Sequence, residues 1–437
     1  MSMLALSAGF AAMMGLLLMS FPIAVIMVLV GVVGGVALYG WPLLTSMGPM
    51  LWGVQNENIL TAIPLFVLLG ELLLRSGIAD RMYGALALWL GRLPGGLLHT
   101  NIGCCALFAA TSGSSVATAA TIGTVALPAL TQRGYAPARS LGSLAAGGTL
   151  GILIPPSVNM LVYGSIANVS IGQLFIAGIV PGILLTLLFM AYIAGESLVA
   201  RRRGTGDPVE PPADRATRVA ALVHLVPPAV IFAIVMGSIY LGLATPTESA
   251  AIGVVVALAL VWKEGRLTAG FLDHCFRQTA KTTGMILLII AAAFVLNLTL
   301  ALGGVAEAMT KWVAAQGLSA TGLLLVLILF YLVLGMFMDV LSMQVLTIPI
   351  AMPIVTAVGI DPIWFGVFIV LMCELGMITP PVGMNLYVVQ GVRKDGGDFR
   401  DVVVGSVPYA VLMIMFTLAL IAVPEIVLWL PTGMAAP

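Results

Sequence analysis

A pattern of prolines and one glycine occurs twice in this chain, and its two copies lie 225 residues apart, as positions 155 and 380 show. Pro128, Gly151 and Pro155-Pro156 in the first copy correspond to Pro353, Gly376 and Pro380-Pro381 in the second. Proline interrupts a helix because it has no N–H to donate and its ring clashes with the preceding turn. The shared spacing therefore indicates an internal duplication with a helix broken at the same place in each half. Broken helices paired in this way are typical of binding sites in secondary transporters.

The residues around this pattern indicate a protein that lies within a membrane. Hydrophobic residues make up 61% of the chain and charged residues 8%, whereas about a quarter of the residues in soluble domains are charged. A membrane-spanning helix needs about 20 apolar residues, so this length accommodates about ten spans. We expect an all-α integral membrane protein with about ten spans plus two re-entrant helical hairpins.

The first half is expected to contain scaffold helices in residues 1–57, with apolar runs near 4–19 and 22–40, and a first repeat in residues 58–199. The repeat comprises an arm helix at 58–76, an amphipathic interfacial helix at 78–93, a re-entrant hairpin at 97–133, a broken helix at 137–168 and a long helix at 171–199. Each arm of the hairpin is too short to cross the bilayer. The polar stretch from Thr111 to Ser115 is therefore predicted to form a tip at mid-membrane.

The second half is expected to follow a polar segment at residues 200–222, whose charges and prolines predict an unburied cytoplasmic linker. Scaffold helices are predicted in 223–281, with spans near 223–242 and 246–262 and a surface helix near 267–280. The second repeat, residues 282–391, comprises an arm helix at 282–302, an amphipathic piece at 303–316, a hairpin at 317–357 and a broken helix at 362–391. One C-terminal helix is expected in 392–437.

The placement of basic residues provides an independent test of this arrangement. With the N-terminus outside, every one of the 18 basic residues except Lys311 falls on the cytoplasmic side, as the positive-inside rule requires. The same span count makes the two halves run in opposite directions. The duplication is thus predicted to be an inverted repeat, with the first hairpin opening inward and the second outward.

Several classes of function find no support in the sequence. The formal net charge is zero and no basic tract occurs, which argues against nucleic acid as a partner. The cysteines and histidines lack the spacings of zinc or other transition-metal sites and of a disulfide framework. No GxxxxGK[ST] string is present, so direct use of ATP is disfavoured. We expect no cofactor other than coupling ions. The cysteines and histidines that lack these spacings are Cys104, Cys105, Cys275, Cys373, His99, His224 and His274.

The two breaks are the strongest candidates for a binding site. Backbone that leaves helical geometry inside a membrane exposes carbonyl groups that lipid cannot satisfy. Free carbonyls and hydroxyls are oxygen ligands that suit a small cation such as sodium. The first predicted sodium site comprises Ser112, Ser114, Ser115, Gly151, Pro155 and Ser157.

The second predicted sodium site comprises Asp339, Ser342, Gly376, Thr379 and Pro380. Asp339 stands out because a carboxylate within the membrane is costly and usually functional. Its equivalent in the first repeat is Ser114, so the two sites differ chemically. A hydrated structural role for Asp339 at the mouth of the hairpin is the alternative.

An anionic substrate could bind between these sites, because helices that begin just after each break direct partial positive charge toward it. The predicted substrate residues are Ser114, Asn159, Gly383 and Asn385. No basic residue lies near either tip, so a carboxylate would depend on helix ends, hydroxyls, asparagines and a bound cation. The competing interpretation is that the small residues only let helices approach closely. Glu71 and Glu374 are interpreted as scaffold residues.

Four segments, SGSSVATAATIGTVALP, GILIPPSVNMLVYG, FMDVLSMQVLTIPIAMPI and ITPPVGMNLYVVQG, resemble the large membrane subunit of TRAP (tripartite ATP-independent periplasmic) transporters. The resemblance extends over essentially the whole chain. It implies an elevator-type transporter of the bacterial inner membrane, with a periplasmic N-terminus in the orientation given above. It also implies sodium-driven uptake of a small carboxylate that a periplasmic solute-binding protein delivers.

The resemblance further implies a small four-helix membrane subunit as a partner. Some relatives carry this subunit fused at the N-terminus, and its absence here predicts a separate chain. A stand-alone sodium/dicarboxylate symporter is the alternative, and a membrane-embedded enzyme is a third reading that lacks a visible nucleophile and base. The identity of the carboxylate does not follow from the sequence.

Overall fold

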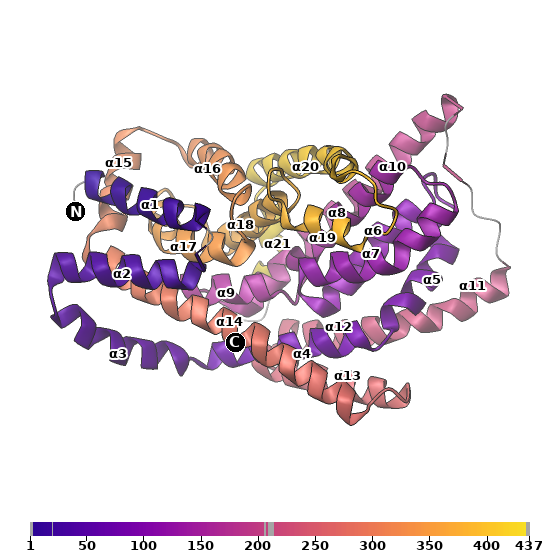
Figure 1. Cartoon of the computed structure of the whole chain (residues 1–437), viewed down its shortest axis with the longest axis horizontal. Coiled ribbons are helices and arrows are strands. Elements are labelled where there is room, and N and C mark those ends of the chain that lie inside the picture. The colour runs from indigo at the N-terminus through magenta and orange to yellow at the C-terminus, as the bar shows by residue number, and fades with distance from the viewer. Residues whose placement is uncertain (1–2, 20, 205–206, 209–213, 434–437) are drawn as a thin grey trace.

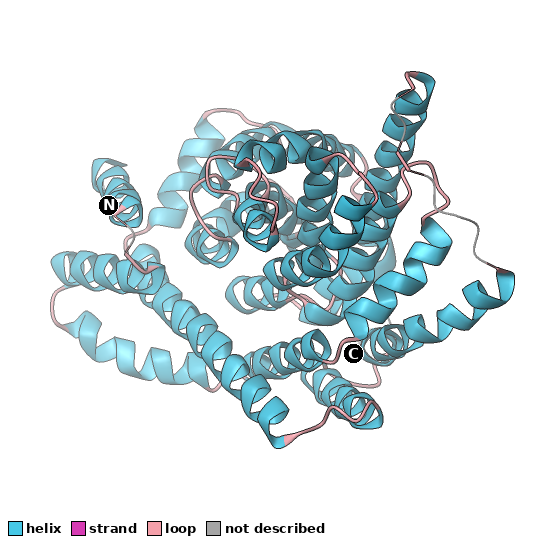
Figure 2. Ribbon diagram, turned by 45° about the vertical axis from the view of Figure 1, so that its right-hand side comes forward, coloured by secondary structure: helices cyan, strands magenta, loops and turns pink. Residues whose placement is uncertain are grey.

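The structure, a computed structural model, describes residues 3–19, 21–204, 207–208 and 214–433. Within these ranges every regular element is a helix and no strand occurs (Figure 2). Six helical segments of the described chain are long and apolar enough to span a membrane. The number of spans rises to eight if each of two bent helix pairs is counted as one span. The predicted spans at 22–40 and 362–391 contain shorter apolar helices, Ile23–Tyr39 and Pro362–Met377. The fold is that of an all-α membrane protein.

The N-terminal region contains α1 (Met3–Leu18), α2 (Ile23–Tyr39) and α3 (Pro42–Gln55). Helix α3 has no counterpart among the helices expected from the sequence. Pro42 lies in its first turn, where a missing N–H costs little. Trp41 at its N-cap and Trp52 near its C-terminal end are 73% and 74% exposed, as is typical of aromatic residues at a membrane interface.

The first repeat region follows with η1 (Asn58–Thr61), α4 (Ala62–Arg75), α5 (Ile78–Leu90), α6 (Leu97–Ser112), α7 (Ser115–Gln132), α8 (Pro137–Leu153), α9 (Val158–Ala167) and α10 (Ile171–Arg202). These bounds agree closely with the expected arm, interfacial helix, hairpin and broken helix. The chain bends by 67° between α4 and α5 and by 42° between α8 and α9.

The middle of the chain forms α11 (Arg215–Ala221), η2 (Leu222–Leu225), α12 (Val226–Tyr240), α13 (Pro246–Lys263) and α14 (Ala269–Leu302). One expectation was wrong here. The surface helix near 267–280 and the span at 282–302 are one continuous helix, α14, because no proline or glycine pair interrupts residues 269–302. Figure 1 shows α14 running from α2 toward α4 and α13, and α14 packs against α2 and α4.

The polar linker at 200–222 is partly helical and not fully solvated. Arg201 and Arg202 extend α10, and α11 begins at Arg215. The Asp207 side chain is only 6% exposed because it forms an ion pair with Arg139 of α8. A charge in the linker is therefore buried by pairing, contrary to the expectation. Residues 205–206 and 209–213 of this segment lie outside the described part of the chain.

The second repeat region contains α15 (Val305–Ala315), α16 (Ala320–Gly335), α17 (Val340–Ala357), α18 (Pro362–Met377) and α19 (Met384–Val392). The region after it contains α20 (Phe399–Ala422) and α21 (Glu425–Thr432) in place of one C-terminal helix. The separation occurs at Pro424, which precedes α21 and cannot continue the hydrogen bonds of α20.

The two halves pack reciprocally at the centre of the molecule. Helix α7 packs against α19, and α17 packs against α9. The second arm of each hairpin thus lies beside the second part of the other half's broken helix. Helix α8 likewise packs against α20, and α10 packs against α18. The division of these helices into scaffold and transport domains stays a prediction.

Candidate functional site

Both helix breaks occur where the repeated prolines predict them. Helix α8 ends at Leu153 and α9 begins at Val158, while α18 ends at Met377 and α19 begins at Met384. The peptide bonds Pro155–Pro156 and Pro380–Pro381 are both cis. At the first break, the carbonyls of Gly151 and Ile152 have no helical donor, because the residues four positions later are the two prolines.

The tip of the first hairpin lies directly against the first break. Gly113 has φ +60°, and a Cβ atom added there would lie 2.7 Å from the carbonyl oxygen of Pro156. A Cβ atom at Gly151 would lie 2.7 Å from the carbonyl oxygen of Ser114. Only glycine permits this approach of backbone to backbone.

The second hairpin makes a comparable contact with the second break. A Cβ atom at Gly335 would lie 2.8 Å from the Cα atom of Gly376. The backbone N–H of Val382 also donates a 3.2 Å hydrogen bond to the carbonyl of Met336. The two breaks differ in accessibility, because Pro155, Pro156 and Ser157 are buried whereas Val382 is 42% exposed.

Predicted site residues cap the helices that begin at the tips and breaks. The Ser114 hydroxyl accepts from the backbone N–H of Ala117 at 3.4 Å and so caps α7. Asp339, at the equivalent position of the second repeat, accepts from the N–H of Ser342 at 3.1 Å and caps α17. The hydroxyl of Ser342 donates to the same carboxylate.

The helices that begin at the breaks themselves are α9 and α19. Ser157 caps α9 by accepting from the N–H of Met160 at 3.4 Å. Gly383 occupies the cap position of α19 with φ +46°. Four helix N-termini thus begin at the two tips and the two breaks, and each carries partial positive charge.

Asn385 of the second break is bound to the first hairpin. Its Nδ2 donates to the Ser115 Oγ at 2.8 Å and to the Ala145 carbonyl at 3.3 Å. Ser115 in turn donates to the Gly148 carbonyl at 2.9 Å. A carbonyl only accepts, so the nitrogen of the amide must face Ala145 and Oδ1 must point away. Oδ1 is buried and has no hydrogen-bond partner among the described residues.

The remaining predicted residues have local partners or are buried nearby. Ser112 shares a 2.9 Å hydrogen bond with Thr118, which the sequence pattern did not single out. Thr379 donates to the Leu375 carbonyl at 2.6 Å, on the helical turn before Pro380. Asn159 is buried with 7% exposure. The structure therefore brings Ser114, Ser115, Gly151 and Asn385 together and places Asp339 with Ser342 at the second tip.

Glu374, interpreted from the sequence as a scaffold residue, also lies in this region. It is fully buried in α18, and neither carboxylate oxygen has a hydrogen-bond partner within the described chain. The carboxyl group lies near the backbone of Leu153, the last residue of α8 before the first break. A lone acid in an otherwise apolar helix was the available signal, since buried acids are rare unless they are used.

Comparisons with known proteins agree with this arrangement. Residues 10–426 match the model of the family described as "Tripartite ATP-independent periplasmic transporter, DctM component". The C4-dicarboxylate TRAP transporter large permease protein DctM of Rhodobacter capsulatus is 34% identical over 407 residues, which cover 89% of this chain and 90% of that protein. The sialic acid TRAP transporter large permease protein SiaM of Vibrio cholerae is 34% identical over 389 residues, covering 87% and 88%.

Among solved structures, the YdaH transporter of Alcanivorax borkumensis has a similar fold, with a TM-score of 0.66 at 15% identity and coverage of 97% and 99% of the two chains. At that identity the likeness concerns the fold alone. The two named relatives are permease proteins rather than enzymes. The match over residues 10–426 shows that the chain is a multi-pass membrane protein of the DctM family, the large permease component of TRAP transporters.

Proposed function

We propose that this chain is the large membrane subunit of a sodium-coupled importer of a small carboxylate, and that it works by an elevator motion. A periplasmic solute-binding protein delivers the carboxylate, and a small four-helix membrane subunit completes the complex. The complex lies in a bacterial inner membrane, with the N-terminus of this chain in the periplasm. The family membership and the basic residues expected on one side of the membrane support these assignments.

The observation that carries the proposal is the orphaned Oδ1 of Asn385. Two hydrogen bonds of its Nδ2 fix the amide at the junction of the two halves, so that Oδ1 faces a buried region with no protein donor among the described residues. A buried acceptor without a partner costs about 1–3 kcal/mol. A bound cation or a ligand donor would offset that cost, which supports a site for ion and substrate at this position.

The oxygen groups around the breaks fit sodium. We assign a first ion to the region of Ser112, Ser114, Ser115, Gly151, Pro155 and Ser157, and a second to that of Asp339, Ser342, Gly376, Thr379 and Pro380. Hydroxyls, carbonyls and one carboxylate are the hard oxygen ligands that such an ion prefers. No sulfur or imidazole group belongs to either set, which argues against a transition metal.

The substrate is assigned to Ser114, Asn159, Gly383 and Asn385, which lie at or near the N-termini of the helices α7, α9 and α19 that begin at the first tip and the two breaks. Helix N-termini bind carboxylates through free backbone N–H groups. The relatives named for C4-dicarboxylate and sialic acid support an organic acid as the solute. The reciprocal packing of α7 with α19 and α17 with α9 supports a central unit that moves as one body.

Uptake of radiolabelled succinate into proteoliposomes tests the proposal. The chain is reconstituted with its small subunit, and the binding protein and a sodium gradient are supplied outside. We expect uptake to require all four components, and Asn385→Ala to lower it by about tenfold, equivalent to 1.4 kcal/mol. Asn56→Ala is the matched control, because the Asn56 amide is exposed and bonds within its own helix.

Two results would contradict the proposal. Equal uptake in a potassium gradient of the same size would exclude sodium coupling. Uptake by this chain without the binding protein and the small subunit would favour the stand-alone symporter instead. A panel of other carboxylates, sugar acids included, extends the assay if succinate is not the solute.

A further inference from the structure

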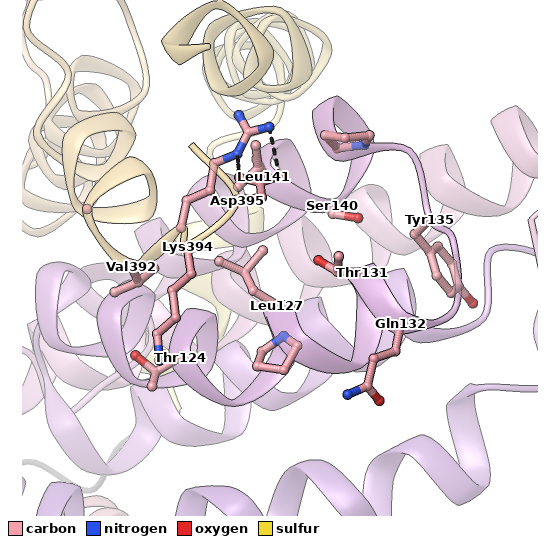
Figure 3. Close-up of a pocket in the computed structure, with 14 residues that line it drawn as sticks. Thr124, Leu127, Thr131, Gln132, Tyr135, Ser140, Leu141, Val392, Lys394 and Asp395 are labelled. Atoms are coloured by element: carbon pink, nitrogen blue, oxygen red, sulfur yellow. Dashed lines mark hydrogen bonds and ion pairs between the residues drawn. The ribbon is translucent and has the colours of Figure 1, made fainter. Parts of the chain in front are cut away.

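A cavity of about 590 Å³ lies at the opposite end of α7 and α19 from the breaks (Figure 3). The last turns of α7, the start of α8 and the segment after α19 line it. Helix α19 has nine residues and therefore extends about 13 Å. The cavity thus lies roughly one short helix away from Asn385. Its volume is within the usual range for small-molecule sites, about 300–1,000 Å³.

The cavity has a lysine that is free to bind an anion. Arg393 and Asp395 at its edge form an ion pair, and Arg393 also pairs with Asp401 at 2.9 Å. The hydrogen bond from Arg393 holds the pKa of the Asp395 carboxyl below its usual range, so this acid stays charged and paired. Lys394 is exposed and has no ion-pair partner among the described residues. Figure 3 shows its side chain extending along the cavity toward Thr124.

The other side of the cavity carries hydroxyl and amide groups. Thr131, Gln132, Tyr135 and Ser140 lie there, opposite Lys394 and Val392 (Figure 3). Ser140 is 3% exposed, and its Oγ has no hydrogen-bond partner in the part of the chain described. A buried hydroxyl without a partner usually marks a position that a water or a ligand satisfies. It is a second observation, independent of Lys394, that indicates a ligand.

We propose that this cavity is a second, weaker carboxylate site that receives the transported anion after it leaves the breaks. The ammonium group of Lys394 pairs with the carboxylate, while the hydroxyls of Ser140 and Thr131 bind the polar part of the solute. The basic residues 393 and 394 place the cavity on the side expected to be cytoplasmic. The inference rests on the proposed function, since it takes the transported carboxylate as the ligand.

Equilibrium binding of radiolabelled succinate to the purified full chain and its small subunit tests the inference. In a potassium buffer without sodium, succinate binding at the central site should be weakened, because that site is proposed to need sodium. Binding in the cavity should be unaffected. We expect sodium-free binding that Lys394→Gln weakens by roughly fivefold, as for an exposed ion pair. Lys263→Gln, at an exposed lysine outside the cavity, should bind like the wild type. Ser140→Ala should weaken binding without lowering the melting temperature, because its hydroxyl bonds to no described protein group.

Three results would overturn the inference. The first is sodium-free succinate binding that Lys394→Gln leaves unchanged. The second is that uncharged succinamide displaces radiolabelled succinate as well as unlabelled succinate does. The third is that inorganic phosphate displaces it equally well, which would indicate a site for any anion. Sodium-dependent binding in Lys394→Gln reports separately on the central site. If that component is missing from the wild type while the Lys394-dependent component is present, the proposed function fails and the cavity site stands.

Discussion

Asn385 donates a 2.8 Å hydrogen bond to Ser115, which lies 270 positions earlier in the chain, and both side chains are buried where the two halves meet. The bond continues through Ser115 to the Gly148 carbonyl in α8. One amide therefore connects the second broken helix, the first hairpin and the first broken helix. Movement of the first hairpin relative to the second broken helix would have to break this connection or carry α19 along with it.

A double-mutant cycle of Ser115→Ala and Asn385→Ala should show a coupling free energy of about 0.6 kcal/mol, with about 1.7 as the upper limit for such interhelical bonds. Reversible unfolding of the purified protein in mixed detergent micelles measures it. The control cycle pairs Ser115→Ala with Thr356→Ala, because the Thr356 hydroxyl bonds within α17. Additive effects in the first cycle would show that the bond does not couple the two halves.

Substitutions of Asp339 should distinguish a role in capping α17 from a role in binding sodium. Asn caps helices about as well as Asp, whereas Ala costs about 1 kcal/mol. We expect Asp339→Asn to leave the unfolding free energy close to that of the wild type and to raise the sodium concentration needed for half-maximal uptake. Asp339→Ala should lower both stability and sodium affinity. Sodium titration of uptake and thermal unfolding provide the two measurements.

Ser114→Asp is the reciprocal change at the equivalent position of the first repeat, where a serine caps α7. The introduced aspartate keeps an oxygen that can cap α7 and adds a negative charge that serine lacks. If Asp339→Asn has the sodium dependence of the wild type, Asp339 is a structural cap alone.

Much of the fold followed from the positions of proline and from the apolar runs. The breaks at Pro155 and Pro380 and both hairpin tips lie where the repeated spacing predicts them, because proline removes the N–H that a helix needs. The exceptions were also local. Helix α3 contains Pro42 in its first turn, which a helix tolerates, and Pro49 in its interior, which normally interrupts a helix. Helix α14 continues through a polar stretch that resembled a helix end.

The sequence predicted the positions of the candidate site residues in the fold but not the contacts between them. The register of the repeat locates Ser114 and Asp339, which cap equivalent helices. No sequence pattern links Asn385 to Ser115, because their contact depends on how the two halves pack. The burial of Asp207 depended on Arg139 of α8, a partner that the composition of the linker could not reveal.

Substitution of Gly151 should be destabilising because the tip of the first hairpin lies directly against it. A Cβ atom there would lie 2.7 Å from the Ser114 carbonyl oxygen, and overpacking of this kind costs about 1–3 kcal/mol. We expect Gly151→Ala to lower both the melting temperature and the rate of uptake. Gly195→Ala is the matched control, because Gly195 lies in α10 with no atom within 4 Å of an added Cβ. That change should stabilise the helix by about 0.5–1 kcal/mol. Equal effects of the two changes would contradict a close tip contact.

Replacing Glu374 should raise the stability of the protein and abolish transport. The Glu374 carboxyl group is fully buried without a hydrogen-bond partner in the described structure, and a buried polar group left without a partner costs about 1–3 kcal/mol, which an apolar residue of similar size would not. We therefore expect Glu374→Leu to raise the melting temperature and to abolish sodium-driven uptake, since the acid lies near the backbone at the first break. Met372→Leu, a volume-conserving change on the same buried helix, should keep uptake and cost less than about 1.5 kcal/mol. A Glu374→Leu protein that transports at the wild-type rate would show that the acid serves neither ion binding nor the movement of the hairpins.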